Sequence, residues 1–198
     1  MAVPRLSDPP ARTRGARLTR STKPMTRRTL ILGGVRSGKS LYAESLARAD
    51  GREVTVVATA TAGDAEMAAR IAAHRARRPP AWSVIETPVR LAETLRQTCR
   101  PERVVIVDCL TLWITNLLSA DDEALADRET QALCARLPEL PGGLILVSNE
   151  TSLGIVPVGA LTRRYLDCAG ALHRRVAAEM DRVVLLVAGL PLTLKGSS

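Results

Sequence analysis

The segment Gly33-Gly34-Val35-Arg36-Ser37-Gly38-Lys39-Ser40 constrains the fold of this chain more than any other. An apolar run over 29–32 precedes it, and a helical pattern over 41–47 follows it. The spacing G-x-x-x-x-G-K-S between a strand and a helix predicts a phosphate-binding loop, because its glycines let backbone N–H groups point at phosphate oxygens. We expect Lys39 to reach the β- and γ-phosphates and the Ser40 hydroxyl to ligate Mg²⁺. The alternative is a glycine-rich turn with a solvated lysine.

Apolar runs alternate with helical patterns along the rest of the chain. The runs are short and rich in β-branched residues, which predicts buried strands at 29–32, 54–58, 104–107, 144–147 and 183–187 and an antiparallel edge strand at 190–195. The helical patterns lie at 40–49, 65–77, 89–99, 112–118, 123–137 and 159–180. This alternation predicts an α/β domain over 29–198 with a mainly parallel sheet and helices on both faces. Ligands of such folds bind at the carboxyl ends of the strands.

Two strand ends carry polar residues that suit this position. Asp108 closes the apolar run 104–107, a pattern typical of the carboxylate that helps to hold Mg²⁺ beside a phosphate-binding loop. The alternative for Asp108 is a cap on the next helix. The run 144–147 ends in Ser-Asn-Glu and continues into a Gly- and Pro-bearing segment over 151–157, which is either a substrate-binding loop or an ordinary connection.

His74 lies in a predicted helix together with several arginines. Arg70 and Arg78 lie about one turn before and after it. A neutral imidazole can attack phosphorus, and neighbouring guanidinium groups disfavour its protonation and could hold a polyphosphate. Taken alone, the spacing favours the alternative, a partly buried histidine on an amphipathic helix with solvated arginines. His173, on a longer helical pattern, is expected to be structural.

The positive charge of the chain is concentrated in its first 28 residues. Residues 1–28 hold eight basic residues and one acidic residue, and the rest holds 20 basic and 19 acidic residues. The folded part is therefore near neutral and poor in aromatic residues, which argues against a nucleic-acid partner. We expect residues 1–28 to be a disordered basic extension. It fits a transit-like presequence, a phosphate-binding arm, or an idle extension or start-site artefact with Met25 as the alternative start; we favour the last.

The cysteines and apolar runs indicate no metal cluster and no membrane span. Cys99, Cys109, Cys134 and Cys168 show no C-x-x-C spacing, so we expect reduced thiols in a cytoplasmic protein. No apolar run reaches the length of a membrane-spanning helix.

Several segments in the same order resemble one enzyme family. They are 33–40, Asp-Cys-Leu-Thr-Leu-Trp-Ile-Thr-Asn-Leu-Leu (108–118), Ser-Asn-Glu (148–150), Gly-Ile-Val-Pro (154–157), Arg-Arg-Tyr (163–165), Ala-Gly (169–170) and Val-Ala-Gly-Leu-Pro (187–191). Over about 28–195 the chain resembles the bifunctional adenosylcobinamide kinase/adenosylcobinamide-phosphate guanylyltransferases of cobalamin biosynthesis. The resemblance implies a RecA-like P-loop α/β fold and a homotrimer. It also implies phosphorylation of adenosylcobinamide by ATP or GTP, then transfer of GMP from GTP through a GMP–histidine intermediate, giving adenosylcobinamide-GDP and pyrophosphate.

The resemblance also implies site residues. His74 and Lys39 are the expected catalytic residues, and Ser40 and Asp108 the expected Mg²⁺ ligands. The expected nucleotide contacts are Gly33, Gly34, Val35, Arg36, Ser37, Gly38, Lys39, Ser40, Ala58, Thr59, Ala60, Arg75, Ala76, Arg77, Glu86 and Asp108.

Two departures from the family pattern bear on these assignments. Some relatives have two adjacent histidines and use the first as nucleophile, whereas this chain has Ala73 followed by His74. We assign the nucleophile to His74; the alternative is a monofunctional P-loop kinase in which His74 is idle. Thr151-Ser152 stands where relatives usually carry Val-Gly, which removes a glycine's freedom to adopt positive φ. A regulatory nucleotide switch is disfavoured, because the guanine-reading N-K-x-D motif is absent.

Overall fold

The structure is a computed structural model that describes residues 28–61, 63 and 65–196. The side chains of Met67 and Arg70 are also outside the described part. The predicted basic extension, 1–28, therefore lies outside the described residues except for Arg28. Arg28 begins the first strand, one residue before the predicted start of that strand at 29.

Seven strands form one sheet in the order β3-β2-β4-β5-β1-β6-β7. Their bounds are β1 Arg28–Gly33, β2 Glu53–Ala58, β3 Ser83–Glu86, β4 Arg103–Asp108, β5 Gly143–Val147, β6 Arg182–Val187 and β7 Leu190–Lys195. All neighbouring strands pair in parallel except β6 and β7, which pair antiparallel. The predicted mainly parallel sheet with an antiparallel edge is confirmed.

The sequence analysis missed β3. This strand has four residues, Ser-Val-Ile-Glu, all exposed at the edge of the sheet. A strand this short gives no continuous apolar run, so its pairing with β2 and not its own pattern defines it.

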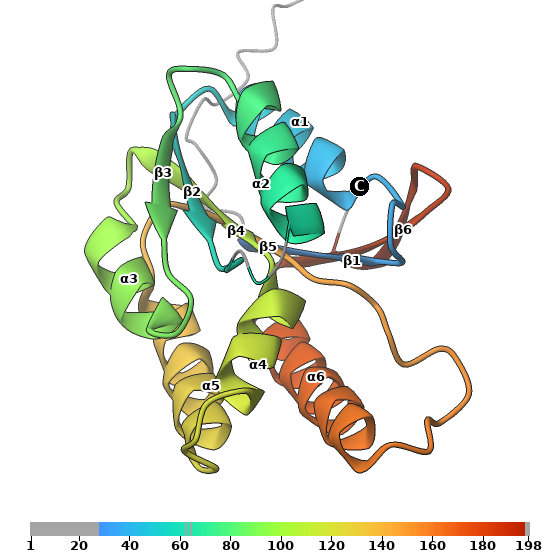
Figure 1. The fold of residues 1–198 in the computed structure, drawn as a ribbon. Coiled ribbons are helices and arrows are strands. Elements are labelled where there is room, and N and C mark those ends of the chain that lie inside the picture. The colour runs from blue at the N-terminus through green and yellow to red at the C-terminus, as the bar shows by residue number, and fades with distance from the viewer. Residues whose placement is uncertain (1–27, 62, 64, 197–198) are drawn as a thin grey trace, which may run out of the picture.

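Helices cover both faces of the sheet, as Figure 1 shows, with α1 and α2 on one face and α3, α4, α5 and α6 on the other. Their bounds are α1 Lys39–Asp50, α2 Ala65–Arg77, α3 Leu91–Thr98, α4 Leu110–Leu118, α5 Leu125–Arg136 and α6 Ala160–Glu179, with a 3-10 turn, η1, at Leu137–Glu139. The six predicted helices are confirmed with shifted ends. No end shifts by more than two residues, and the two-residue shifts are at the starts of α3, α4 and α5. No helix among these described residues is long and apolar enough to cross a membrane.

The sheet separates two hydrophobic clusters. The larger lies on the side of α3, α4, α5 and α6 and contains the fully buried Trp113, whose indole donates a hydrogen bond to the Val89 carbonyl at 2.6 Å. The smaller lies under α1, where Ala43 and Ala47 pack against Ile31, Val56 and their neighbours. Small residues let α1 approach the strands closely, so its first turn lies directly over the end of β1.

Gly142 offers a test of the packing that brings β4 and β5 together. Gly142 and Gly51 share a φ of +81°, but a Cβ at 142 would lie 2.0 Å from the Arg100 carbonyl oxygen, whereas a Cβ at 51 would meet nothing within 4 Å. Gly51→Ala should therefore cost only left-handed strain, about 1–2 kcal/mol. Gly142→Ala adds a backbone clash and should cost more than about 4 kcal/mol of unfolding free energy, measured in urea. Equal losses in the two variants would contradict this account.

Candidate active site

The glycine-rich loop is held in place by its neighbours at the carboxyl end of the sheet. The Glu150 N–H, after β5, donates to the Gly33 carbonyl at 2.9 Å, and the Gly189 N–H, in the β6–β7 turn, donates to the Ser37 carbonyl at 3.1 Å. A Cβ on Gly33 would lie 2.5 Å from the Leu186 carbonyl oxygen, so this position needs glycine. Gly34, Val35 and Arg36 are exposed at the crest of the loop. The loop has the fixed base and open crest that phosphate binding requires.

Lys39 begins α1 and lies back across this loop. Its side chain is buried, and its ammonium donates to the Gly34 carbonyl at 2.5 Å and to the Ser37 hydroxyl at 3.5 Å. Burial lowers the pKa of Lys39, an effect that the nearby Cys109 and Asp108 oppose. The ammonium is therefore held against one backbone carbonyl and one hydroxyl of the loop, at the place where a phosphate would need it.

The predicted contacts on β2, β3 and β4 form one row across the sheet. Ala58 pairs with Glu86 on one side and with Asp108 on the other, and Asp108 pairs in turn with Val147 of β5. Strands lie about 4.8 Å apart, so side chains at these positions are near neighbours. The sheet thus brings Ala58, Glu86 and Asp108 together, as the carboxyl-end rule predicted.

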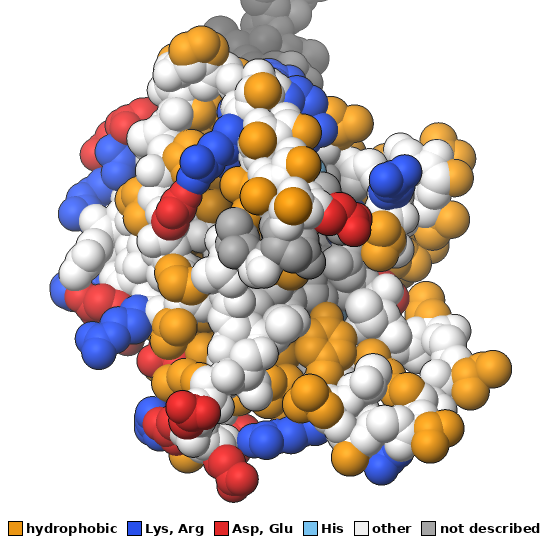
Figure 2. Space-filling model, viewed as in Figure 1, with side chains coloured by type: hydrophobic (Ala, Val, Ile, Leu, Met, Phe, Trp, Pro, Cys, Tyr) orange, Lys and Arg blue, Asp and Glu red, His pale blue; other side chains and the backbone are white. Residues whose placement is uncertain are grey.

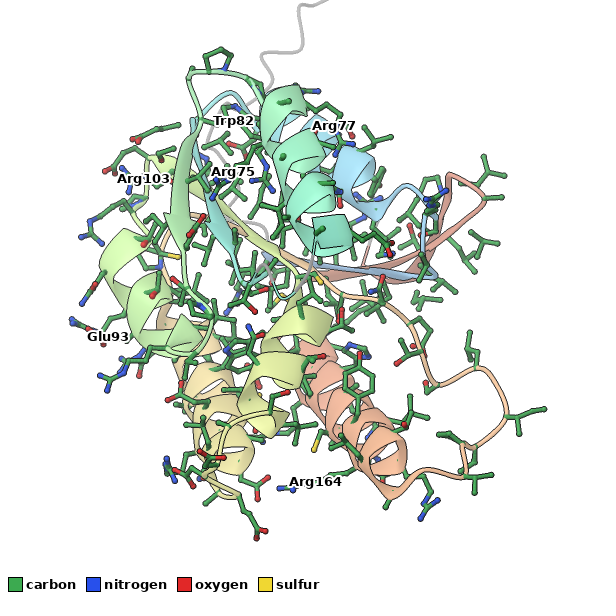
Figure 3. The ribbon with its side chains drawn as sticks, in the orientation of Figure 1. Arg75, Arg77, Trp82, Glu93, Arg103 and Arg164 are labelled. Atoms are coloured by element: carbon green, nitrogen blue, oxygen red, sulfur yellow. The ribbon has the colours of Figure 1, made fainter. Side chains whose placement is uncertain are left out.

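Helix α2 is bound to the rest of the domain through its arginines. In Figure 3 Arg75 lies between α2 and β3, and Arg77 lies toward α1. Arg75 forms an ion pair with Glu86, and Arg77 donates to Oε1 of Glu44 on α1 at 2.9 Å. Glu44 is buried, and its other oxygen lies 3.5 Å from Arg48. Arg75 and Arg77 are therefore paired with carboxylates, although both side chains remain partly exposed to solvent.

Asp108 faces two groups from the end of α2. Arg78 donates to its Oδ2 at 3.1 Å, and Nδ1 of His74 lies 3.7 Å from the same oxygen. The Arg78 side chain is 9% exposed, the His74 side chain 38%. Ser40, Glu44, Arg78 and Asp108 line one narrow cleft beside α1. The structure thus directs His74 toward Asp108 at the end of β4, whereas Ala73 is exposed.

Sequence reasoning noticed Arg78 only as a neighbour of His74 and did not place Glu44 in the site. Nothing in the local pattern shows that a residue on α1 and a residue on β4 bind the end of α2. The one sequence signal that Glu44 belongs to the site was its position one turn after Ser40 on the same helix.

Asn116 fixes the predicted nucleotide-contacting segment 58–60. Its amide nitrogen donates to the Thr59 carbonyl at 2.7 Å and to the Pro88 carbonyl at 3.0 Å. The Thr59 hydroxyl in turn is buried and bonds both the carbonyl and the N–H of Cys109. The ends of β2, β3 and β4 are therefore joined by the Asn116 side chain and by the Cys109 backbone, which gives the 108–118 motif a structural role.

The end of β5 forms a second polar cluster against α6. Oγ of Ser148 and Nε2 of His173 lie 2.7 Å apart, and both residues are buried. The Asn149 amide donates to the Thr111 hydroxyl at 3.1 Å. Burial would raise the pKa of Glu150, but hydrogen bonds from Ser152 and other groups lower it overall. His173 therefore holds the segment that supports the glycine-rich loop, in line with its expected structural role.

The connection after this cluster is exposed and apolar. Leu153, Ile155, Val156 and Val158 are all more than two-thirds exposed. Neither Thr151 nor Ser152 is among the described residues with positive φ, and the Ser152 N–H donates to the Glu150 carboxylate at 2.7 Å. Position 152 therefore does not need a glycine to adopt a positive φ in this conformation. The assignment of 151–157 as a substrate-binding loop stays a prediction.

Comparisons of the sequence with known proteins agree on one family. Residues 29–194 match the family model described as cobinamide kinase / cobinamide phosphate guanyltransferase. The bifunctional adenosylcobalamin biosynthesis protein CobP of Pseudomonas aeruginosa is 57% identical over 169 residues, which cover 85% of this chain and 98% of that protein. The corresponding protein CobU of Escherichia coli is 37% identical over 180 residues, which cover 84% of this chain and 98% of that protein.

Solved structures share the fold at low sequence identity. A protein from Pyrococcus horikoshii OT3 superposes with a TM-score of 0.53 at 8% identity, covering 87% of this chain and 88% of its own. A prototypical ATPase from the type III secretion system of pathogenic bacteria gives a TM-score of 0.50 at 12% identity, with 81% and 52% covered. The fold is that of RecA-like P-loop NTPases, as expected.

The buried Ser148–His173 pair predicts a pH dependence of stability. Burial lowers the pKa of His173 below its ordinary 6.5, although Glu150 opposes the shift. The unfolded chain then binds the proton more readily, so this contribution to stability is complete above about pH 6.5 and is lost as the pH falls toward the folded-state pKa. His173→Gln should therefore lose less unfolding free energy than the wild type between pH 7.5 and 5.5, measured by urea denaturation. Parallel pH profiles would contradict the assignment.

Proposed function

The chain belongs to the cobinamide kinase / cobinamide phosphate guanyltransferase family, and we propose that it carries out both reactions at the glycine-rich loop, with His74 as the covalent nucleophile. It is an enzyme of cobalamin biosynthesis whose substrates are cobinamide and nucleoside triphosphates. The observation that carries the assignment to His74 is its position: the ring lies 3.7 Å from Asp108, at the same sheet edge as Lys39.

The kinase reaction needs little from the protein beyond position and charge. The adenosylcobinamide hydroxyl attacks the γ-phosphorus of ATP or GTP, and the nucleoside diphosphate leaves. Backbone N–H groups of 33–40 would bind the phosphate oxygens, and Lys39 would neutralise the charge that develops on them. Its ammonium is already buried at the base of the loop, which increases the strength of that interaction.

The guanylyltransferase reaction would use His74 in two displacements. The imidazole nitrogen attacks the α-phosphorus of GTP and releases pyrophosphate; the phosphate of adenosylcobinamide phosphate then takes GMP from the histidine. Asp108 faces Nδ1, which favours the tautomer with its proton there and leaves the lone pair on Nε2 for attack. Arg75, Ala76, Arg77 and Glu86 adjoin this place and remain our proposed nucleotide contacts, together with Ala58, Thr59 and Ala60.

The residues at the cleft suit a magnesium ion delivered with the nucleotide. Ser40 and Asp108 line it and offer the oxygen ligands that Mg²⁺ prefers. Among the described residues no group of three or more His, Cys, Asp or Glu could hold a metal ion, so phosphate and water would supply the remaining ligands. Bound there, Mg²⁺ would neutralise charge on the phosphates during transfer.

We also propose that the enzyme works as a homotrimer in the cytoplasm. Leu190, Leu192 and Leu194 lie on one face of the edge strand β7 and are all more than half exposed. Hydrophobic side chains gather around this hairpin on the right of Figure 2. An apolar edge strand is a ready contact for another copy of the chain. All four cysteines are free, which suits a reducing compartment.

The first test follows the covalent intermediate. Protein incubated with GTP labelled at the α-phosphate should acquire acid-labile, alkali-stable label, and His74→Ala should abolish it because the His74 imidazole is the proposed attachment site of GMP. His173→Gln is the matched control and should keep the label, since His173 is buried against Ser148. Label that persists in His74→Ala would exclude the assignment. If the wild type is folded and binds GTP but never acquires label, the covalent intermediate is contradicted and the monofunctional kinase is supported.

The second test concerns assembly. Sedimentation equilibrium of the wild type should give about three times the chain mass of 21.3 kDa. Leu192→Glu puts a charge on the apolar face of β7 and should shift the mass to that of one chain. Gln97→Glu adds the same charge on the exposed surface of α3 and should leave the trimer intact. A monomeric wild type at micromolar concentration would rule the trimer out.

A further inference from the structure

Asp108 is bound by an internal cation in this structure. Arg78 donates to Oδ2 of Asp108 at 3.1 Å, and the two side chains are 9% and 19% exposed. Arg78 and Asp108 line the same cleft as Ser40. The guanidinium therefore occupies a place next to the carboxylate that would face a divalent cation delivered with the nucleotide.

From this arrangement we infer that Arg78 is a positioning residue that couples metal binding to phosphate binding by exchanging partners. It neutralises Asp108 when no metal is bound; when Asp108 turns to the metal, Arg78 pairs with the phosphate oxygens of the nucleotide. The inference rests on the proposed magnesium site and adds to it a role for a residue outside the predicted contact set.

Electrostatics makes the exchange obligatory. A divalent ion beside Asp108 repels the guanidinium, whose charge is almost fully buried, and a buried charge without a partner is strongly unfavourable. Glu44, the other carboxylate that lines the cleft, already pairs with Arg48 and Arg77 and so is not free to pair with Arg78. The incoming phosphates are the anions that could take Arg78, and a planar guanidinium binds phosphate oxygens in bidentate fashion.

The exchange has a thermodynamic consequence. The metal alone must displace Arg78 without giving it a new partner, so it binds weakly; the metal together with a nucleotide binds well. Metal and nucleotide therefore bind with positive coupling, and each raises the affinity of the other by the same factor. Arg78 ensures that Asp108 is not committed to a metal ion before a nucleotide arrives.

The test measures binding and not turnover. Mn²⁺, which replaces Mg²⁺ and is seen by electron paramagnetic resonance, is titrated into metal-free protein with and without saturating GDP. In Arg78→Gln, Mn²⁺ alone should bind about tenfold more tightly than in wild type, because Asp108 is freed, and the factor by which GDP tightens Mn²⁺ should fall accordingly. Calorimetric titration of GDP, with and without Mn²⁺, should show the same loss of coupling.

Two further variants keep the test decisive. Arg78→Met retains much of the side-chain volume without charge, so it should behave as Arg78→Gln does, and either folded variant suffices. Arg96→Gln removes an arginine that pairs with Glu93 on the exposed surface of α3 and should leave both affinities unchanged. Unaltered Mn²⁺ affinity and coupling in folded Arg78 variants would overturn the role of Arg78 alone. No Mn²⁺ binding to the wild type even with GDP would overturn the metal site itself.

Discussion

The parallel pairing of β5 with both β4 and β1 is the constraint on which the site depends. It aligns Asp108 with Val147 and Val147 with Ile31, so the segments that follow these residues leave the sheet side by side. The loop after β1 is then supported on both flanks, by Glu150 after β5 and by Gly189 after β6. Residues far apart in the sequence are positioned by backbone hydrogen bonds of the sheet, which is why so few side chains are needed to hold the loop.

Around this rigid edge, the charges of the site are paired within the protein. Arg75, Arg77 and Arg78 bind Glu86, Glu44 and Asp108, which belong to β3, α1 and β4. The exposed pair of Arg75 and Glu86 contributes little to stability. The other two carboxylates are mostly buried, and removing Asp108 would leave the buried Arg78 guanidinium without its anionic partner. Binding a polyphosphate at such a site exchanges one set of ionic partners for another, and affinity depends on the difference between them.

The sequence revealed the parts of this arrangement that depend on local pattern. The strand–loop–helix at 33–40 and the carboxylate at 108 follow from spacing, and the sheet follows from alternating apolar runs. β3 was missed because an exposed edge strand has no apolar run, and its pairing with β2 is a long-range property. The partners of Arg77 and Arg78 were missed for the same reason: charge spacing within α2 says nothing about which carboxylates another helix or strand brings near. The hydrogen bonds of Asn116 to Thr59 and Pro88 span 57 and 28 positions of the sequence, so local pattern could not predict them either.

Two chemistries at one phosphate-binding loop impose opposite demands on α2. In the mechanism proposed above, the γ-phosphorus must be open to the adenosylcobinamide hydroxyl in the first reaction, whereas the α-phosphorus must be within reach of His74 on α2 in the second. A helix fixed by a fully apolar interface could satisfy only one of these geometries. The ion pairs at the end of α2 are instead directional and exchangeable: Arg77 with Glu44 and Arg78 with Asp108. Each of these two arginines can pass from a carboxylate to a phosphate without losing an anionic partner. Ionic attachment therefore gives α2 a defined resting position and a low-cost route away from it, which a bifunctional site on a rigid sheet requires.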